Sequence, residues 1–361
     1  MKRSPLFYLF LITLFGAIAR IWFFWTDGLH VDEYFTVELL RHDLWYVVQY
    51  AMTDDCNPPL FYILDWFSVQ VFGMNAFAQR LPSIIAGILL IPAVYCLGKE
   101  YRGETLGLLS ALAVSTLGPM WYYSQFGRAY MLECLLFTIF CIYYIRLMRG
   151  DHRTYHWIGL VTTATLLAYT HLFSIVPLTF LIVCLFFVSP RKTLLWSSAI
   201  LVLTAPLLLL FNAILLWRTV PRDVATQSWN WYGATVPQIV IFAPLEFFSY
   251  TFVFWIPMVC YATWIYRRMK EVWILPVSFI LSFLVLLTLA NTTPVFIRYT
   301  LLFVPVLVTI GLLPVADFIT SPDHTRAQKC FVIGSFGILY FSIVLYGFWT
   351  GMYLPKGWIM I

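Results

Sequence analysis

Long apolar segments separated by short polar ones follow one another along the chain. A helix that crosses a bilayer needs about 20 consecutive apolar residues, and the pattern predicts about eleven such helices. We expect them at residues 5–25, 76–98, 104–122, 129–147, 193–216, 239–266, 272–290, 299–317 and 329–350, and as two short helices within residues 155–188 that meet at an outer bend near Thr170-His171. The pattern therefore predicts an all-α integral membrane protein, with residues 1–361 as a single polytopic domain and no soluble domain.

Composition supports a membrane protein and excludes several other classes. Hydrophobic residues make up 61% of the 361 residues and charged residues 11%, whereas a soluble domain averages about 45–50% and about 25%. A soluble chain of this length could not bury so much apolar surface. The net charge of +5 comes from dispersed basic residues, so nucleic acid is not an expected partner. The seven cysteines form no CxxC pair, which argues against a disulfide framework or a zinc ribbon.

The apolar segment at residues 58–73 differs from the others because it is too short to cross the membrane. Its 16 residues would form a helix of about 24 Å, against a hydrocarbon core of about 30 Å, and it carries Asp65. We place it as an interfacial helix in an external loop at residues 26–75, and we predict a second external loop at residues 217–238. With this topology 14 of the 22 Lys and Arg residues face the cytoplasm, in agreement with the positive-inside rule.

Several acidic and polar residues converge on the outer side in this topology. Asp32 and Glu33 follow the first predicted helix, where a short interfacial helix is expected to start near Asp32. They would be either capping and solvated acids or carboxylates that activate a nucleophile. Asn57 precedes two prolines that open the helix at residues 58–73. This segment is either a stiff helix start or a set of N–H groups that hold an anion.

Basic and titratable residues on the same side allow similar alternatives. Arg128 would bind a phosphate, pair with Glu133, or extend to the interface. His171 lies at the expected bend of a long apolar run. It would be a hydrogen-bonded residue of the bundle, a metal ligand or a hydrogen-bond donor to a phosphate. Arg298 begins an outer helix end, as an interfacial anchor or a phosphate ligand. For Arg80 the structural role is favoured.

The order of the outer-side motifs is more specific than any one of them. In chain order they are Asp32-Glu33, Asn57-Pro58-Pro59-Leu60-Phe61-Tyr62, Phe72-Gly73, Arg80-Leu81-Pro82-Ser83, Arg128-Ala129-Tyr130, Tyr169-Thr170-His171 and Arg298-Tyr299. This set resembles the polytopic C-type glycosyltransferases, specifically the dolichyl-phosphate-mannose–protein mannosyltransferase-like family 39 group and the related bacterial lipid A aminoarabinose transferases. The resemblance extends from about residue 1 to about residue 310 and implies the C-type glycosyltransferase fold.

The resemblance also implies an activity and roles for individual residues. Family members transfer a sugar, a hexose or a pentose, from a polyprenyl-phosphate donor on the non-cytoplasmic side, and the displacement is expected to invert the anomeric centre. Asp32 matches the first-loop catalytic aspartate, which would act as a general base on an acceptor hydroxyl or at least orient the acceptor, and Glu33 matches the acid paired with it. Arg128, Arg298 and the region of Asn57 would hold the lipid phosphate.

Other residues that match the family are expected to lie near the cavity that holds the lipid phosphate. His171 matches a position that is Lys or His in relatives, Glu133 falls where the aminoarabinose transferase has an aspartate, and Tyr130 belongs to the Arg128 motif. The implied partners are a polyprenyl-phosphate sugar lipid, a lipid or glycan acceptor and the membrane itself. The implied location is a bacterial or archaeal plasma membrane, with the active site facing the outside.

The chain departs from its relatives at one motif that bears on cofactors. Some relatives have Glu-Lys-Pro where this chain has Cys56-Asn57-Pro58, so a phosphate-binding lysine and a carboxylate suited to a metal are both missing. A divalent metal is therefore not expected, because Cys56 and His171 would supply only two ligands. No nucleotide sugar is expected as the donor, and the absence of a Gly-rich phosphate loop, P-loop or Rossmann fingerprint agrees with this.

The alternative function is a membrane transporter or lipid flippase, which would also place polar residues within a helix bundle. Transporters usually carry charges near the bilayer midplane and often consist of two related halves. In this chain the candidate residues gather at one face and no internal repeat is visible.

Overall fold

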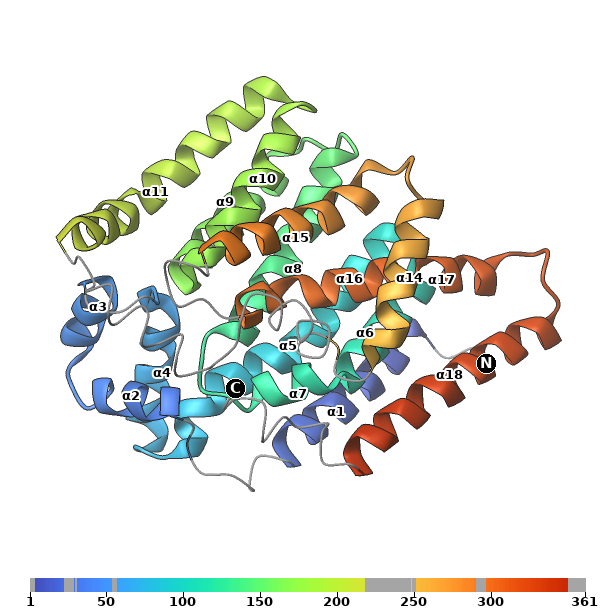
Figure 1. Ribbon diagram of the computed structural model, residues 1–361, viewed down its shortest axis with the longest axis horizontal. Helices are drawn as coiled ribbons and strands as arrows, with labels where there is room; N and C mark the ends of the chain where they lie inside the picture. The colour runs from blue at the N-terminus through green and yellow to red at the C-terminus, as the bar shows by residue number, and fades with distance from the viewer. Residues whose placement is uncertain are drawn as a thin grey trace.

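The computed structural model describes residues 4–22, 29, 31–53, 57–217, 248, 251–289 and 297–349, and all regular elements in these ranges are helices. Apart from Trp217, the predicted second external loop lies outside the described residues. Figure 1 shows roughly aligned, tilted helices with a group of short helices, α2 to α4, at one end.

The helices follow one another with short connections through most of the chain. In chain order the α-helices and 3₁₀-helices (η) are α1 (Pro5–Trp22), α2 (Val31–Leu39), α3 (Leu44–Thr53), α4 (Pro59–Phe72), α5 (Ala76–Arg102), α6 (Glu104–Thr116), α7 (Gly118–Ser124), α8 (Tyr130–Met148), α9 (Thr154–Thr170), η2 (Leu172–Ser174), α10 (Ile175–Phe186), α11 (Pro190–Trp217), α14 (Phe252–Ile265), α15 (Lys270–Leu289), η4 (Ile297–Phe303), α16 (Val304–Gly311), α17 (Leu313–Thr320) and α18 (Arg326–Trp349). Each segment that was predicted to span the membrane contains at least one of these helices.

Length and apolar composition make four stretches of the described chain candidate membrane spans. They are Ala76–Arg102, Tyr130–Met148, Lys270–Thr288 and Arg298–Thr320. Shorter apolar helices accompany them, and large apolar side chains such as Leu201 and Phe331 are mostly exposed on the outer helices. A soluble protein would not leave so many large apolar groups in water. The predicted all-α integral membrane protein is confirmed.

Two predicted spans are broken rather than continuous. The segment predicted at residues 104–122 divides at Leu117, whose backbone is extended, and Pro119 lies in the first turn of α7. The segment predicted at residues 299–317 divides into η4, α16 and α17, and Pro305 and Pro314 lie in the first turns of the two α-helices. Proline lacks the N–H that continues a helix and is tolerated best in a first turn. The breaks therefore fall where the prolines favour them.

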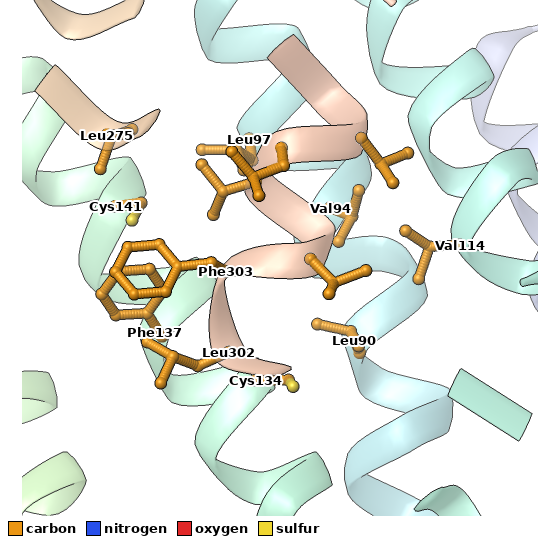
Figure 2. Packing of buried hydrophobic residues seen from close by; sticks show 14 of the residues in the cluster. Leu90, Val94, Leu97, Val114, Cys134, Phe137, Cys141, Leu275, Leu302 and Phe303 are labelled. Atoms are coloured by element: carbon orange, nitrogen blue, oxygen red, sulfur yellow. The ribbon is translucent and has the colours of Figure 1, made fainter. Parts of the chain in front are cut away.

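The core is formed where α5, α6, α8, α15 and the η4–α16 segment meet. Figure 2 shows side chains of these helices packed together, and a T-shaped contact joins the rings of Phe137 and Phe303 at 5.0 Å. The labelled residues are Leu90, Val94, Leu97, Val114, Cys134, Phe137, Cys141, Leu275, Leu302 and Phe303. In lipid such contacts stabilise the bundle mainly by close van der Waals packing, because the surrounding solvent is itself apolar.

The two ends of α5 carry different sets of charged residues. Arg80 lies near its first residue, and Lys99 and Arg102 lie in its last turn, about 30 Å away along the helix axis. We call the end near Arg80, with α2, α4 and the turn at residues 125–129, the acidic end. We call the other end, where Arg102 pairs with Asp317, the basic end. The candidate site residues lie at the acidic end.

Candidate active site

The first-loop acids lie in the first turn of α2, as the sequence predicts. The helix begins at Val31, so Asp32 and Glu33 are both close to its positive end, where negative charge is stabilised. Successive helical residues point about 100° apart, and the two carboxylates therefore meet different surroundings. Glu33 is fully buried, whereas the Asp32 side chain is 24% exposed.

Glu33 joins α2 to two other parts of the acidic end. Its carboxylate accepts two hydrogen bonds from Arg80, from Nε to Oε1 and from Nη2 to Oε2, both at 2.7 Å. The backbone N–H of Gly127 donates to the same Oε1 at 2.7 Å. A Cβ at Gly127 would lie 3.1 Å from that oxygen, which is tighter than most Cβ contacts, so a larger residue here would have to push the carboxylate away by a few tenths of an ångström. The prediction that Arg80 is structural agrees with this bidentate pair.

Asp32 pairs with an arginine that comes much later in the chain. Arg298, at the start of η4, donates from Nη2 to Oδ2 of Asp32 at 2.9 Å. The guanidinium also lies over the rings of Phe126 and Tyr130, with distances of 5.9 and 5.4 Å to the ring centroids. These aromatic faces attract a cation, and together with Asp32 they orient Arg298.

Arg128 bridges the two short helices of the first loop. Its Nη1 donates to Thr36 Oγ1 on α2 at 3.1 Å and to Tyr62 Oη on α4 at 3.2 Å. Its backbone carbonyl accepts from Ser83 on α5 at 2.9 Å. The turn that precedes α8 is thus fixed against three helices, and the guanidinium is directed toward α4.

A pocket forms between the start of α4, the turn before α8 and the bend after α9. Its lining consists of Asn57, Pro58, Phe61, Tyr62, Arg128, Ala129, Tyr130 and His171. Pro58 caps α4 and Pro59 occupies its first position, as the sequence predicts. Four of the predicted binding residues therefore line one pocket, while Arg298 reaches the same place through its contact with Tyr130.

Glu133 and His171 form a buried pair beside this pocket. Oε1 of Glu133 lies 3.7 Å from Nδ1 of His171, too far for a hydrogen bond. Among the described residues, neither carboxylate oxygen of Glu133 nor Nδ1 of His171 has a hydrogen-bond partner. Burial, together with the charges of Arg128 and Arg298, lowers the pKa of His171 to about 3. His171 is therefore a neutral imidazole at physiological pH.

Few side chains that could bind a metal ion lie together in the part of the chain that the structure describes. Within those ranges no group of three or more His, Cys, Asp and Glu side chains is placed to hold one. Glu133 and His171 provide two potential ligands, whereas a zinc site in a protein usually has at least three. Cys56, the other ligand considered from the sequence, lies outside the described residues.

Sequence reasoning did not find all the residues that build this end. Arg20, inside the first predicted span, is fully buried and donates to Ser124 Oγ and to the carbonyl oxygens of Gly16 and Val114. A charge within an apolar segment was the available signal, because such residues are rare in membrane helices unless they have a role. Asp65, expected at an interface with water, is instead fully buried.

The comparison with known protein families agrees with the resemblance inferred from the motifs. Residues 56–217 match the family model described as dolichyl-phosphate-mannose-protein mannosyltransferase. No curated protein matches the chain by sequence.

Two membrane proteins of known structure share the fold. ArnT from Cupriavidus metallidurans, solved with undecaprenyl phosphate, gives a TM-score of 0.62 at 14% identity, over 92% of this chain and 63% of that chain. The archaeal oligosaccharyltransferase AglB from Archaeoglobus fulgidus, solved with an inhibitory peptide and a dolichol-phosphate, gives 0.60 at 13% identity, over 94% of this chain and 55% of that chain. The chain thus spans less than two thirds of either protein. The predicted resemblance to the membrane C-type glycosyltransferases is confirmed, and the chain has their fold.

Proposed function

We propose that this protein is a glycosyltransferase that moves a sugar from a polyprenyl-phosphate donor to an acceptor hydroxyl, with inversion, on the non-cytoplasmic face. One observation carries the proposal. A partly exposed carboxylate, Asp32, is held by Arg298, and Arg298 packs on Tyr130 in the wall of a pocket that also contains Arg128. A base and two cations at one pocket suit a reaction in which an alcohol loses a proton and a phosphate departs.

Arg128 and Asn57 are the proposed ligands of the donor phosphate. Arginine binds phosphate through two parallel hydrogen bonds, and both residues line the pocket. The start of α4 adds to this site, because the first N–H groups of a helix have no partner within it. Pro59 has no N–H, so Leu60 and Phe61 would supply the first donors.

Asp32 is the proposed general base. The acceptor oxygen would attack the anomeric carbon while the bond from that carbon to the phosphate oxygen breaks. The hydroxyl proton would pass to Asp32 Oδ, and the bonding electrons would leave with the lipid phosphate. Arg128 and Arg298 would then stabilise the negative charge that develops on the departing phosphate. A single in-line displacement inverts the configuration of the sugar.

Glu33 and the buried pair of Glu133 and His171 are proposed to support this step. Glu33 was expected to act beside Asp32; its bidentate contact with Arg80 favours a role in fixing α2, and so in positioning Asp32. His171 lines the pocket as a neutral imidazole, which can both donate and accept a hydrogen bond to a sugar hydroxyl. Glu133, next to it, would set the orientation of its ring.

The family and the fold suggest the remaining partners and the location. The described ArnT structure contains undecaprenyl phosphate and the AglB structure a dolichol-phosphate, which supports a lipid-linked donor for this chain. A lipid or glycan end is the proposed acceptor, and a bacterial or archaeal plasma membrane is the proposed location. The acidic end would face the outside, since the basic loops favour the cytoplasm.

The central test is the Asp32→Asn variant, assayed with a radiolabelled polyprenyl-phosphate sugar in nanodiscs. We expect transfer to fall by at least about 10²-fold, as for the loss of a general base, with an unchanged thermal unfolding midpoint. The matched control is Asp43→Asn, because Asp43 is exposed and its side chain accepts a hydrogen bond from the backbone N–H of Tyr46, which an asparagine oxygen can also accept. Full transfer by Asp32→Asn would contradict the assignment. Lipid movement across vesicles without any sugar transfer would instead favour a flippase.

A further inference from the structure

Asp65 is the buried acid that the proposed mechanism leaves without a role. It lies in the middle of α4, on the buried face that also carries Phe61, Tyr62 and Ser68. Its side chain is fully buried, and neither carboxylate oxygen has a hydrogen-bond partner in the described part of the chain. A buried carboxylate without hydrogen bonds is costly, so a protein keeps one only where it serves a purpose or carries a proton.

The surroundings of Asp65 connect it with the phosphate site. Tyr62, three residues earlier on the same face of α4, accepts the hydrogen bond of Arg128. Residues three apart on a helix are neighbours, so Asp65 lies one turn from the group that anchors the guanidinium. Arg128 and Glu33 are the charges that act on Asp65 most strongly, the first favouring its ionised form and the second opposing it.

The charged groups on the elements around α4 define what Asp65 encounters. From α2 come Glu33 and Asp32, which pair with Arg80 of α5 and with Arg298 of η4. The turn before α8 contributes Arg128. Helix α3 carries no charged side chain and only tyrosines among its titratable groups, and the nearby end of α9 contributes Tyr169 and the neutral His171. Arg128 is thus the cation for which an ionised Asp65 would compete.

We infer that Asp65 is a positioning residue for the donor phosphate, with a neutral carboxyl that leaves Arg128 directed into the pocket and an ionised form that draws Arg128 away from it. This inference rests on the proposed function. Burial, reinforced by the negative charge of Glu33, raises the pKa of Asp65 well above its usual value, which favours the neutral form.

Binding of the donor phosphate is therefore expected to be linked to a proton on Asp65. A negative phosphate on Arg128 disfavours the carboxylate and raises the pKa of Asp65 further. The linkage has a definite sign, because the bound state holds more protons than the free state. Affinity is highest at low pH and falls as the pH rises through the pKa of Asp65 in the free protein. If the phosphate shifts that pKa by one unit, the total loss is about tenfold.

The test uses a probe whose own charge does not change with pH. The methyl ester of a polyprenyl phosphate is a phosphodiester, like the donor, but carries no sugar to transfer. Its dissociation constant is measured in nanodiscs from about pH 5 to about pH 9 for the wild type, Asp65→Asn and Asp43→Asn. We expect about tenfold weaker binding at the alkaline end for the wild type and Asp43→Asn, and a flat profile for Asp65→Asn, whose amide cannot ionise.

A second measurement keeps the inference open to disproof if Asp65→Asn does not fold. Calorimetry of the wild type in two buffers with different ionisation enthalpies reports the protons taken up on binding. We expect uptake of a fraction of a proton that is largest near the midpoint of the pH profile. Equal pH profiles of the wild type and Asp65→Asn, or no proton uptake, would overturn the role of Asp65 alone. If the wild type binds no phosphodiester at any pH, the proposed function fails and this inference fails with it.

Discussion

The acidic and basic ends of the bundle contain similar residue types, but the burial and pairing of their charged side chains differ. At the basic end Glu100, Glu271 and Asp317 each pair with an arginine, and the arginine side chains are about one third or more exposed. At the acidic end Glu33 and Glu133 are fully buried, and Glu133 lacks any hydrogen-bond partner within the described chain. Buried polar groups without partners cost about 1–3 kcal/mol each.

This difference is consistent with the proposed site at the acidic end. Partly exposed ion pairs contribute little to stability, and the buried acid among these three, Glu271, keeps its pair with Arg149. The basic end therefore needs no special explanation beyond anchoring the ends of α5, α8, α15 and α17. The free-energy cost of burying unpartnered acids, as at the acidic end, is typical of sites where charge and protonation state matter for chemistry. The comparison also makes predictions, because equivalent substitutions at the two ends should have unequal effects.

The largest difference is expected for the removal of one partner from an ion pair. Glu33→Ala leaves Arg80 buried without its carboxylate, and such a change typically costs about 3–5 kcal/mol. Glu100→Ala removes the partner of Arg146 from a partly exposed site and should cost less than about 1 kcal/mol. Thermal or denaturant unfolding in detergent measures both. Equal losses would remove the distinction between the two ends.

A smaller but specific effect on activity is expected for the arginine that holds Asp32. Arg298→Gln removes a charged donor from the proposed base, and loss of one such donor typically lowers the rate about 10²-fold. The counterpart at the basic end is Arg102→Gln, which breaks the pair with Asp317 and should leave kcat/KM of sugar transfer unchanged. A comparable loss of transfer in both variants would count against a local role for Arg298.

His171 provides a test through the pH dependence of stability. Burial lowers its pKa in the folded protein to about 3, from about 6.5 in an unfolded chain, so protons bind preferentially to the unfolded chain. Stability is therefore lost as the pH falls from about 6.5 toward about 3, by about 2 kcal/mol at pH about 5. His171→Gln should abolish this part of the loss. Unfolding midpoints of both proteins at several pH values check it, and parallel profiles would show that His171 does not contribute.

The smallest effect is expected from salt. The pair of Arg102 and Asp317 is partly exposed, with side chains 42% and 35% accessible, and mobile ions screen such pairs. The small destabilisation by Arg102→Gln should therefore vanish at about 1 M salt. Destabilisation by Glu33→Ala should persist, because ions do not reach that pair. The unfolding midpoints of these variants at low and high salt separate the two cases.

Local sequence features were sufficient to predict much of the fold. The prolines at positions 58 and 59 mark the start of α4, and the polar step at Thr170 and His171 coincides with the end of α9. These features act within a few residues, so their physical effect can be deduced from the chain alone. The breaks at Leu117 and before α16 were missed because the prolines in the first turns of α7 and α16 lie within continuous apolar runs, which were interpreted as single helices.

The pairing of charges could not be predicted in the same way. Glu33 lies 47 residues from Arg80, and Asp32 lies 266 residues from Arg298. The sequence does not show which distant arginine an acid will pair with, and several arginines were equally plausible partners for either acid. The burial of Asp65 was missed for a related reason, since the pattern of α4 predicts an interfacial helix but not which polar residue faces inward. Only the arrangement of the helices decides these questions.

The ion pair between Asp32 and Arg298 has a consequence for biosynthesis. Synthesis proceeds from the N-terminus, so α2 is made and placed long before η4 leaves the ribosome. Asp32 therefore lacks Arg298 until 266 further residues have been synthesised. During that interval its charge depends on water at the membrane surface, because a carboxylate does not enter lipid unpaired. The proposed base is thus completed only when nearly the whole bundle has been inserted, and earlier intermediates contain the acid without its cation.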